Sequence, residues 1–162
     1  MASRRTRTRR IAALLALPLL LAANDAPAPS GPAGQTTGQS ATLTVSFTGL
    51  RSAKGYVRAC LTRDPRFFPN CEKDPHALKQ SVAATPPARI SFSAVASGDY
   101  ALSVLHDENG NARADMLLGI PREGFGFSEN PRIRFGPPKF AAARFHIGTG
   151  DLTKEVRLQY FL

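Results

Sequence analysis

Apolar and polar residues alternate in short segments from Ala41 to the end of the chain. In the first segment Leu43, Val45 and Phe47 alternate with threonine and serine. Because successive side chains of a strand point to opposite faces, this pattern predicts a strand with one buried and one polar face. The same pattern predicts further strands at residues 54–61, 88–95, 100–105, 139–147 and 156–162.

Together the predicted strands supply the apolar sides of a single core. The residues expected to face inward in the later strands are Val57, Ala59, Leu61, Ile90, Phe92, Ala94, Tyr100, Leu102, Val104, Ala141, Ala143, Phe145, Ile147, Val156, Leu158, Tyr160 and Leu162. Residues 51–54 predict a hairpin connection, residues 74–79 predict one helical turn, and residues 117–138 have no regular pattern. Short strands without a strong helix predict an all-β fold: an antiparallel β-sandwich of about seven strands, immunoglobulin-like or prealbumin-like.

The first 40 residues do not share this alternation. Residues 1–23 combine five arginines, a short apolar run and small residues near the end, which predicts a secretory signal peptide. The apolar run is short for a permanent span, although retention as an uncleaved anchor stays open. Residues 24–40 have the composition of a disordered, Pro- and Gly-rich linker. We therefore expect an exported domain at residues 41–162, periplasmic or secreted, with no transmembrane segment after cleavage.

Signal removal would change the charge of the chain. The full chain has 21 Lys and Arg against 12 Asp and Glu, a formal net charge of +9. Five of the basic residues precede Ala23, so the remainder has a net charge near +4. That part contains no run of basic residues interleaved with aromatic ones, so nucleic acid is not an expected partner.

Two cysteines, Cys60 and Cys71, fall in the predicted domain. In an exported protein an even number of cysteines predicts a disulfide, and with two cysteines the pairing is forced if they pair. Closure of so short a loop stabilises a fold by roughly 3 kcal/mol. Two free, buried thiols are the alternative.

Asp and Asn recur at alternate positions directly after the strand at residues 100–105. This spacing resembles the start of a calcium loop, in which alternate side chains direct oxygens at one hard cation. The candidate ligands are the side chains of Asp107, Asn109, Asn111, Asp115 and Glu123 and the backbone carbonyl of Arg113. So few carboxylates predict a weak Ca²⁺ site with a Kd on the order of 10⁻⁴–10⁻³ M. The alternative is an Asx-rich turn whose side chains bond only to their own backbone.

Two longer segments, GDYALSVLHDENGN at residues 98–111 and LGIPREGFGFS at residues 118–128, resemble the central motifs of the DUF2141 family. The resemblance covers roughly residues 41–162 and implies an exported bacterial β-sandwich without an assigned activity. Ala112 departs from the family pattern, since Gly is expected there, as at the sixth position of a calcium loop. Leu118 occupies the twelfth position, where a bidentate Glu belongs, so Glu123 would have to supply that carboxylate by folding back.

A second group of candidates surrounds this loop: His106, Arg122, Phe125 and Phe127, which would form a ligand surface. The alternatives are structural roles: His106 would be a hydrogen-bonded structural histidine, and the two phenylalanines would cap the sandwich. No complete catalytic constellation is visible, so the leading hypothesis is a non-enzymatic binding or scaffold module whose partner is a cell-envelope glycan or protein. The alternative is a small periplasmic hydrolase that uses His106, Asp107 and Arg122.

Overall fold

The structure, a computed structural model, describes residues 40–133 and 136–162. The predicted signal peptide at residues 1–23 lies outside the described residues, as does the predicted linker up to residue 39. In the part of the chain that is described, no helix has the length and apolar character needed to cross a membrane.

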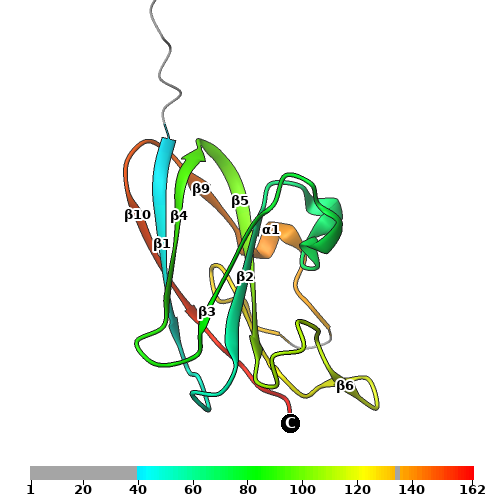
Figure 1. Cartoon of the computed structure of the whole chain (residues 1–162). Helices are drawn as coiled ribbons and strands as arrows, with labels where there is room; N and C mark the ends of the chain where they lie inside the picture. Colours follow the sequence, from blue (N-terminus) through cyan, green and yellow to red (C-terminus); the bar gives the residue numbers. More distant parts are fainter. Residues whose placement is uncertain (1–39, 134–135) are drawn as a thin grey trace, which may run out of the picture. The chain divides into compact units, whose positions relative to one another are not determined.

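The described residues form two packed β-sheets (Figure 1). The strand order is β10-β1-β4 in the first sheet and β3-β2-β5-β8 in the second, where β9 also pairs with β5. The strands of the sheets are β1 (Ser40–Thr48), β2 (Tyr56–Thr62), β3 (Leu78–Ala83), β4 (Arg89–Ala96), β5 (Gly98–Asp107), β8 (Gly124–Phe127), β9 (Arg144–Ile147) and β10 (Leu152–Arg157). An all-β sandwich is therefore confirmed, and it contains one parallel pair, β1 with β10.

Short elements connect these strands. They are two 3₁₀ turns at Pro65–Phe67 and Cys71–Lys73, a small hairpin of β6 (Met116–Leu117) and β7 (Ile120–Pro121), and the single helical turn α1 (Phe140–Ala143). The hairpin and β8 lie within the stretch 117–138 that the sequence pattern left irregular. Both follow the Asp- and Asn-rich segment that begins at Asp107, so they determine where the second half of the candidate calcium loop lies.

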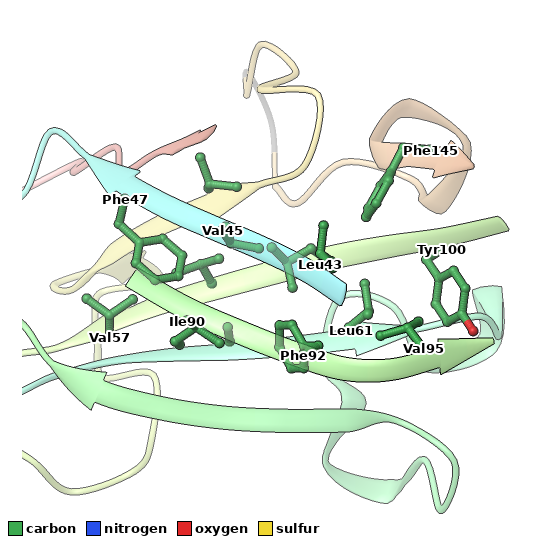
Figure 2. Close-up of a cluster of buried hydrophobic side chains, with 14 of the residues drawn as sticks. Leu43, Val45, Phe47, Val57, Leu61, Ile90, Phe92, Val95, Tyr100 and Phe145 are labelled. Carbon is green, nitrogen blue, oxygen red and sulfur yellow. The ribbon is translucent and has the colours of Figure 1, made fainter. Parts of the chain in front are cut away.

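The core fills the space between the two sheets with the apolar sides of their strands (Figure 2). Leu43 and Val45 of the first sheet and Val57 and Leu102 of the second are all fully buried. The alternation of β1 thus predicts its burial correctly, with threonine and serine on the outer side. Burial of one such aliphatic side chain stabilises the fold by about 1.5–3 kcal/mol.

One predicted core residue, Ala94, faces outward instead. Ser93 and Ala94 together oppose Thr42 of β1, so the register shifts by one residue at this point. Ala94 adopts a left-handed backbone with φ 55°, as the extra residue of a bulge does. Because the bulge reverses the alternation, Val95 is buried where a regular strand would place Ala94.

The predicted hairpin at residues 51–54 is wrong. β1 pairs with β4 and β10, whereas β2 pairs with β3 and β5, so the connection passes from one sheet to the other. Gly49 and Gly55 bound it with left-handed φ values of 74° and 68°. Glycine adopts this conformation without a steric cost, which allows the chain to leave one sheet and enter the next within a few residues.

The predicted helical turn at residues 74–79 is also wrong, because the chain enters β3 at Leu78. β3 is the edge strand of the second sheet and is held by its backbone pairing with β2. Its side chains are exposed except Val82, which is partly buried. An edge strand that buries so little shows no alternation, so the sequence pattern did not reveal it.

The last two predicted strands are right only in part. The first half of residues 139–147 is α1 and not a strand, so Ala141 is exposed, while Phe145 and Ile147 of β9 are buried as expected. The final strand begins earlier than predicted, at Leu152, and the chain leaves the sheet after Arg157. Leu162, predicted to face inward, is consequently half exposed.

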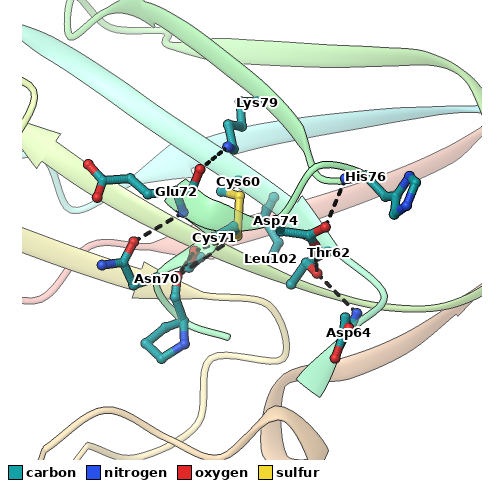
Figure 3. The surroundings of a disulfide bond; sticks show 12 residues. Cys60, Thr62, Asp64, Asn70, Cys71, Glu72, Asp74, His76, Lys79 and Leu102 are labelled. Carbon is teal, nitrogen blue, oxygen red and sulfur yellow. Dashed lines mark hydrogen bonds between the residues drawn. A yellow bond between two sulfur atoms is a disulfide. The ribbon is translucent and has the colours of Figure 1, made fainter. Parts of the chain in front are cut away.

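The disulfide Cys60–Cys71 is present, as predicted (Figure 3). It ties β2 to the proline-containing loop that precedes β3. The same loop is held by Asp74, whose Oδ2 accepts a hydrogen bond of 2.5 Å from Thr62 Oγ1 and whose Oδ1 accepts one from the N–H of His76. Disulfide and carboxylate together hold this loop against β2.

Two glycines allow β8 to pack against the end of the chain. Gly124 and Gly126 face the core side of the second sheet, and a Cβ at Gly126 would lie 2.6 Å from Val156 Cγ1. A Cβ at Gly124 would overlap the ring of Tyr160. The alternate residues Phe125 and Phe127 face the opposite side of the sheet, since successive side chains of a strand point in opposite directions.

We expect Gly126→Ala to lower the free energy of unfolding by about 2 kcal/mol, because the added methyl overlaps Val156 in a packed core. Urea denaturation measures this change. Gly148→Ala is the matched control: no atom lies within 4 Å of its added Cβ, so its midpoint should equal that of the wild type. Equal midpoints for all three proteins would show that β8 does not pack this closely.

Candidate functional site

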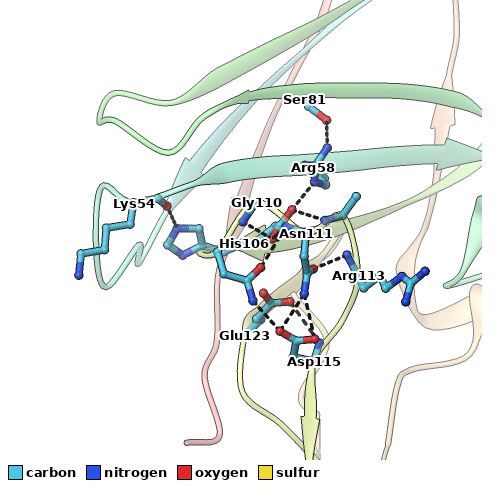
Figure 4. Close-up of polar contacts among 12 residues, drawn as sticks. Lys54, Arg58, Ser81, His106, Gly110, Asn111, Arg113, Asp115 and Glu123 are labelled. Carbon is cyan, nitrogen blue, oxygen red and sulfur yellow. Dashed lines mark hydrogen bonds and ion pairs between the residues drawn. The ribbon is translucent and has the colours of Figure 1, made fainter.

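The candidate loop begins at the last residue of β5, Asp107, and returns to the second sheet at β8. The β6–β7 hairpin lies between Asp115 and Glu123, so the chain folds back and brings these two carboxylates together. Figure 4 shows the loop side chains gathered beside the ends of β2 and β5. Leu118, at the twelfth position of the sequence pattern, lies in the turn of the hairpin and takes no part in this cluster.

Asp107 is fully buried and its carboxylate accepts four hydrogen bonds. Oδ1 accepts from the backbone N–H groups of Gly110 and Asn111 at 2.9 and 3.1 Å. Oδ2 accepts from the backbone N–H of Ala112 at 2.9 Å and from Nε of Arg58 at 2.6 Å. The side chain therefore shapes the loop by collecting its first N–H groups around one charge.

This arrangement sets the protonation of Asp107. Burial raises its pKa, but the hydrogen bonds from Arg58, Ala112 and Gly110 and the charge of Arg58 lower it, so the pKa lies below its ordinary value. Ala112 adopts φ 62°, the left-handed conformation in which a calcium loop has Gly. The substitution of Ala for Gly thus leaves the expected turn in place at a modest steric cost.

The two asparagines link the loop to Asp115. Nδ2 of Asn109 donates to Asp115 Oδ2 at 2.6 Å, and Nδ2 of Asn111 donates to both oxygens of Asp115 at 3.1 and 3.0 Å. Their side-chain oxygens accept from backbone N–H groups, Asn109 from Asn111 and Asn111 from Arg113. The side chains of Asn109 and Asn111 thus accept from backbone N–H groups of their own loop and also donate to the carboxylate of Asp115.

Glu123 is buried at 4% exposure, and its Oε1 is a buried side-chain polar atom without a hydrogen-bond partner among the described residues. Its Oε2 accepts one long hydrogen bond, 3.4 Å, from the N–H of Asp115. Burial raises the pKa of Glu123, the Asp115 N–H lowers it, and the charges of Asp107, Asp115 and Glu108 raise it again, so the pKa lies above its ordinary value. Ionised Glu123 would therefore lack the donors that compensate the charges of Asp107 and Glu108.

Glu108 is paired on the other side of the loop. Its Oε2 accepts from Arg51 at 2.5 Å and its Oε1 accepts from the hydroxyl of Ser52 at 2.6 Å. The hydrogen bond from Arg51 lowers the pKa of Glu108, although burial opposes it. Arg51 also donates to the backbone carbonyls of Arg122 and Leu162, so it joins this loop to the C-terminus.

His106 is fully buried between the sheets and both of its ring nitrogens are engaged. Nε2 lies 2.9 Å from the carbonyl oxygen of Lys54 and therefore donates to it, while Nδ1 accepts from the hydroxyl of Tyr160 at 2.6 Å. This arrangement does not favour the hydrolase alternative, since a general base must reach its substrate. The structural role of His106 is the better-supported interpretation.

His106 and the two phenylalanines of the expected ligand surface lie on opposite sides of the second sheet, while Arg122 is exposed. His106 faces the core, whereas Phe125 and Phe127 lie on the outer side of the second sheet with Ala101 and Ala143. Phe127 is buried there at 4% exposure and meets Phe68 edge-to-face. Burial of the rings is therefore the correct interpretation for Phe127, although the rings cover the outer face of the sheet and not one end of the sandwich.

The sequence did not reveal the two arginines that hold the loop. Arg58 occupies an outward position of β2. From the sequence alone, an isolated basic residue at such a position is interpreted as a solvated side chain. Its pairing with Asp107 follows from the register that places Tyr56 opposite Asp107 and Arg58 opposite Leu105. Arg51 lies in the connection between the sheets, far from Glu108 in sequence. Strand pairing brings Arg58 to Asp107, and the path of the connection between the sheets brings Arg51 to Glu108.

The fold and the loop define the class of this protein: a disulfide-bonded, two-sheet β domain with an acidic Asx-rich loop at the end of β5. The chain belongs to the DUF2141 family, described as an uncharacterized protein conserved in bacteria, whose family model matches residues 45–155. This match confirms the resemblance drawn from the two sequence motifs. No curated protein and no solved structure matches the chain.

We expect Asp107→Asn to lower the free energy of unfolding by about 2–3 kcal/mol at neutral pH, because it leaves Arg58 and the loop N–H groups facing an amide. Since the folded pKa is lowered, the stabilisation by Asp107 is present above the unfolded pKa and is lost as pH falls through the folded value. The difference between wild type and variant should shrink below about pH 4.

Urea titrations at several pH values measure that difference. Asp151→Asn, at an exposed residue, is the control and should differ little from wild type at every pH. A gap between wild type and Asp107→Asn that stays constant down to the acid limit would contradict the role given to the carboxylate.

Proposed function

We propose that this protein is an exported, non-enzymatic β-sandwich module whose Asp- and Asn-rich loop binds one calcium ion. The supporting observation is the buried, unpartnered Oε1 of Glu123 beside Asp107 and Asp115. Of these two carboxylates, Asp107 already accepts four hydrogen bonds from N–H groups, whereas among the described residues Asp115 accepts only from side-chain amides. A cation between Glu123 and Asp115 would supply the missing positive charge.

The remaining ligands come from the same turn. The amides of Asn109 and Asn111 reach Asp115 through their nitrogens. To act as ligands, both amides would have to turn over and release the N–H groups of Asn111 and Arg113 that their oxygens now accept from. The carbonyl of Arg113 follows in the same loop. In this proposal Asp107 acts mainly by organising the backbone. A site built from oxygen ligands with two full carboxylates matches the weak, extracellular type of calcium site.

A proton is the competing way to satisfy Glu123. Its raised pKa favours protonation, yet a protonated Glu123 would still have no acceptor or donor for Oε1 among the described residues. Calcium is favoured over magnesium because the loop offers several protein oxygens, whereas Mg²⁺ retains most of its waters and prefers fewer protein ligands. The two explanations differ in how stability responds to calcium.

Thermal melting of the purified protein in EDTA and in calcium tests the proposal. At a calcium concentration near ten times Kd, linkage predicts about 1.4 kcal/mol of added stability, roughly 3–7 °C in Tm. Glu123→Gln should raise the Tm in EDTA, since it removes a buried charge, and should abolish the calcium response. Equal concentrations of magnesium, at matched ionic strength, should produce a much smaller shift.

Glu72→Gln is the matched control for that experiment, because Glu72 is exposed and lies in the disulfide-bonded loop. It removes the same charge and should leave the calcium response unchanged. A wild-type Tm that calcium does not move would overturn the metal proposal. In that case Glu123 is held as the neutral acid, and the stability should fall as pH rises toward its raised pKa.

Export is the second part of the proposal, and the disulfide supports it because such bonds persist in oxidising compartments. Fractionation of the native bacterium with N-terminal sequencing of the recovered chain tests it. We expect the chain in the periplasm or medium, beginning after residue 23, with Cys60 and Cys71 oxidised. A cytoplasmic, reduced chain that retains Met1 would contradict export.

A further inference from the structure

The β6–β7 hairpin exposes large apolar side chains on both sides of its ribbon. Met116 and Leu117 of β6 are 56% and 50% exposed, and Leu118 and Ile120 are 96% and 43% exposed. The hairpin projects at the end of the domain where the C-terminus lies, opposite the start of β1 (Figure 1). Scattered apolar residues on a surface are ordinary, but four in one projecting hairpin indicate a contact with something outside the chain.

Leu118 carries two unfavourable features at the same position. Its side chain is almost fully exposed, and its backbone is left-handed with φ 51°, next to Gly119 with φ 81°. This is the hairpin turn in which Asn and Gly are preferred, and a bulky residue with positive φ is rare. Neither feature stabilises the folded chain, so leucine at this position is explained by an interaction that the hairpin makes elsewhere.

Two unpaired cations flank the hairpin. Arg113 precedes it and Arg122 follows it; both are exposed, and within the described residues neither guanidinium has an ion-pair partner. By contrast Arg51 and Arg58, which lie closer to the body of the domain, are paired with Glu108 and Asp107. An apolar tip flanked by these two guanidiniums is complementary to a bilayer with anionic headgroups, and the carboxylates of Asp115 and Glu123 at the base of the same hairpin oppose that attraction.

We propose that the β6–β7 hairpin is a membrane-docking element that inserts its apolar tip into an anionic bilayer surface, with Arg113 and Arg122 at the headgroups. A bilayer accommodates apolar side chains on both sides of a narrow ribbon at once, whereas a rigid protein surface meets such a convex tip on one side. A second copy of this chain is the other occupant that the test below distinguishes. The docking does not require bound calcium, and a test in EDTA keeps its outcome separate from that of the calcium proposal.

The chain contains no tryptophan, so Leu117→Trp places a single reporter in the hairpin. With vesicles of phosphatidylglycerol in EDTA, we expect its emission to move to shorter wavelength and to be quenched by brominated lipid. Vesicles of phosphatidylcholine should give little of either change. Co-sedimentation of the wild-type protein with the same vesicles provides a second measurement without the reporter.

Leu118→Asn is the decisive variant, because Asn favours the left-handed turn and removes the apolar tip. It should keep or raise the unfolding midpoint and weaken vesicle binding about tenfold or more. Arg113→Gln with Arg122→Gln should remove the preference for phosphatidylglycerol. Leu78→Asn, at an exposed leucine of β3, is the matched control and should bind like the wild type.

The proposal is overturned if the wild type binds neither kind of vesicle, or if Leu118→Asn binds as tightly as the wild type. Analytical ultracentrifugation gives the other outcome. A concentration-dependent dimer that Leu118→Asn abolishes, without vesicle binding by the wild type, would assign the hairpin to contacts between copies of the chain and overturn membrane docking.

Discussion

The buried carboxylate of Asp107 is the constraint on which one end of this domain depends. A charge without access to water must be compensated by nearby donors, and here the compensation comes from three backbone N–H groups and Arg58. Those donors fix the path of the loop as it leaves β5. They also attach the loop to β2, because Arg58 belongs to that strand. The backbone of residues 110–112 is thereby held around the carboxylate.

The compensation at Asp107 leaves the rest of the acidic cluster less well satisfied. Arg58 and Arg51 are engaged by Asp107 and Glu108, and among the described residues no ion pair joins Glu123 to Arg113 or Arg122. Glu123 cannot move away, because the next residue, Gly124, enters β8 and packs on Tyr160. Tyr160 is in turn fixed by its hydrogen bond to His106. The unpartnered oxygen is therefore a consequence of the packing between β5, β8 and the C-terminal segment.

The sequence predicts the parts of the fold that depend on local alternation. β1 and β2 alternate buried with partly buried residues, and β5 buries Tyr100, Leu102 and Val104 on its inner side, so the inward residues of these strands follow directly from the pattern. The bulge at Ala94, the edge strand β3 and the passage of the chain between sheets were missed, because each depends on pairing between distant strands. The disulfide was predictable, since only two cysteines were available to pair.

The candidate site also has one part that the sequence predicts and another that depends on the fold. The spacing of Asp107, Asn109, Asn111 and Asp115 is local and places all four in one turn, as the sequence indicates. The pairing of Arg58 and Arg51, and the burial of Glu123, come from strand register and packing, which no single stretch of sequence contains. Local spacing thus locates a loop, whereas the balance of charge within it is set by residues from other elements.

The loop and the hairpin are physically connected, which makes their charges interdependent. The hairpin begins directly after Asp115 and ends two residues before Glu123, and the N–H of Arg122 donates to the carbonyl of Asp115 at its base. With Asp115 and Glu123 ionised, their negative charge lies beside Arg113 and Arg122 and reduces the positive potential at the tip. A cation bound between the carboxylates would cancel that charge and strengthen the attraction to an anionic surface. By linkage, an anionic surface that engages the tip would then strengthen cation binding to the same degree.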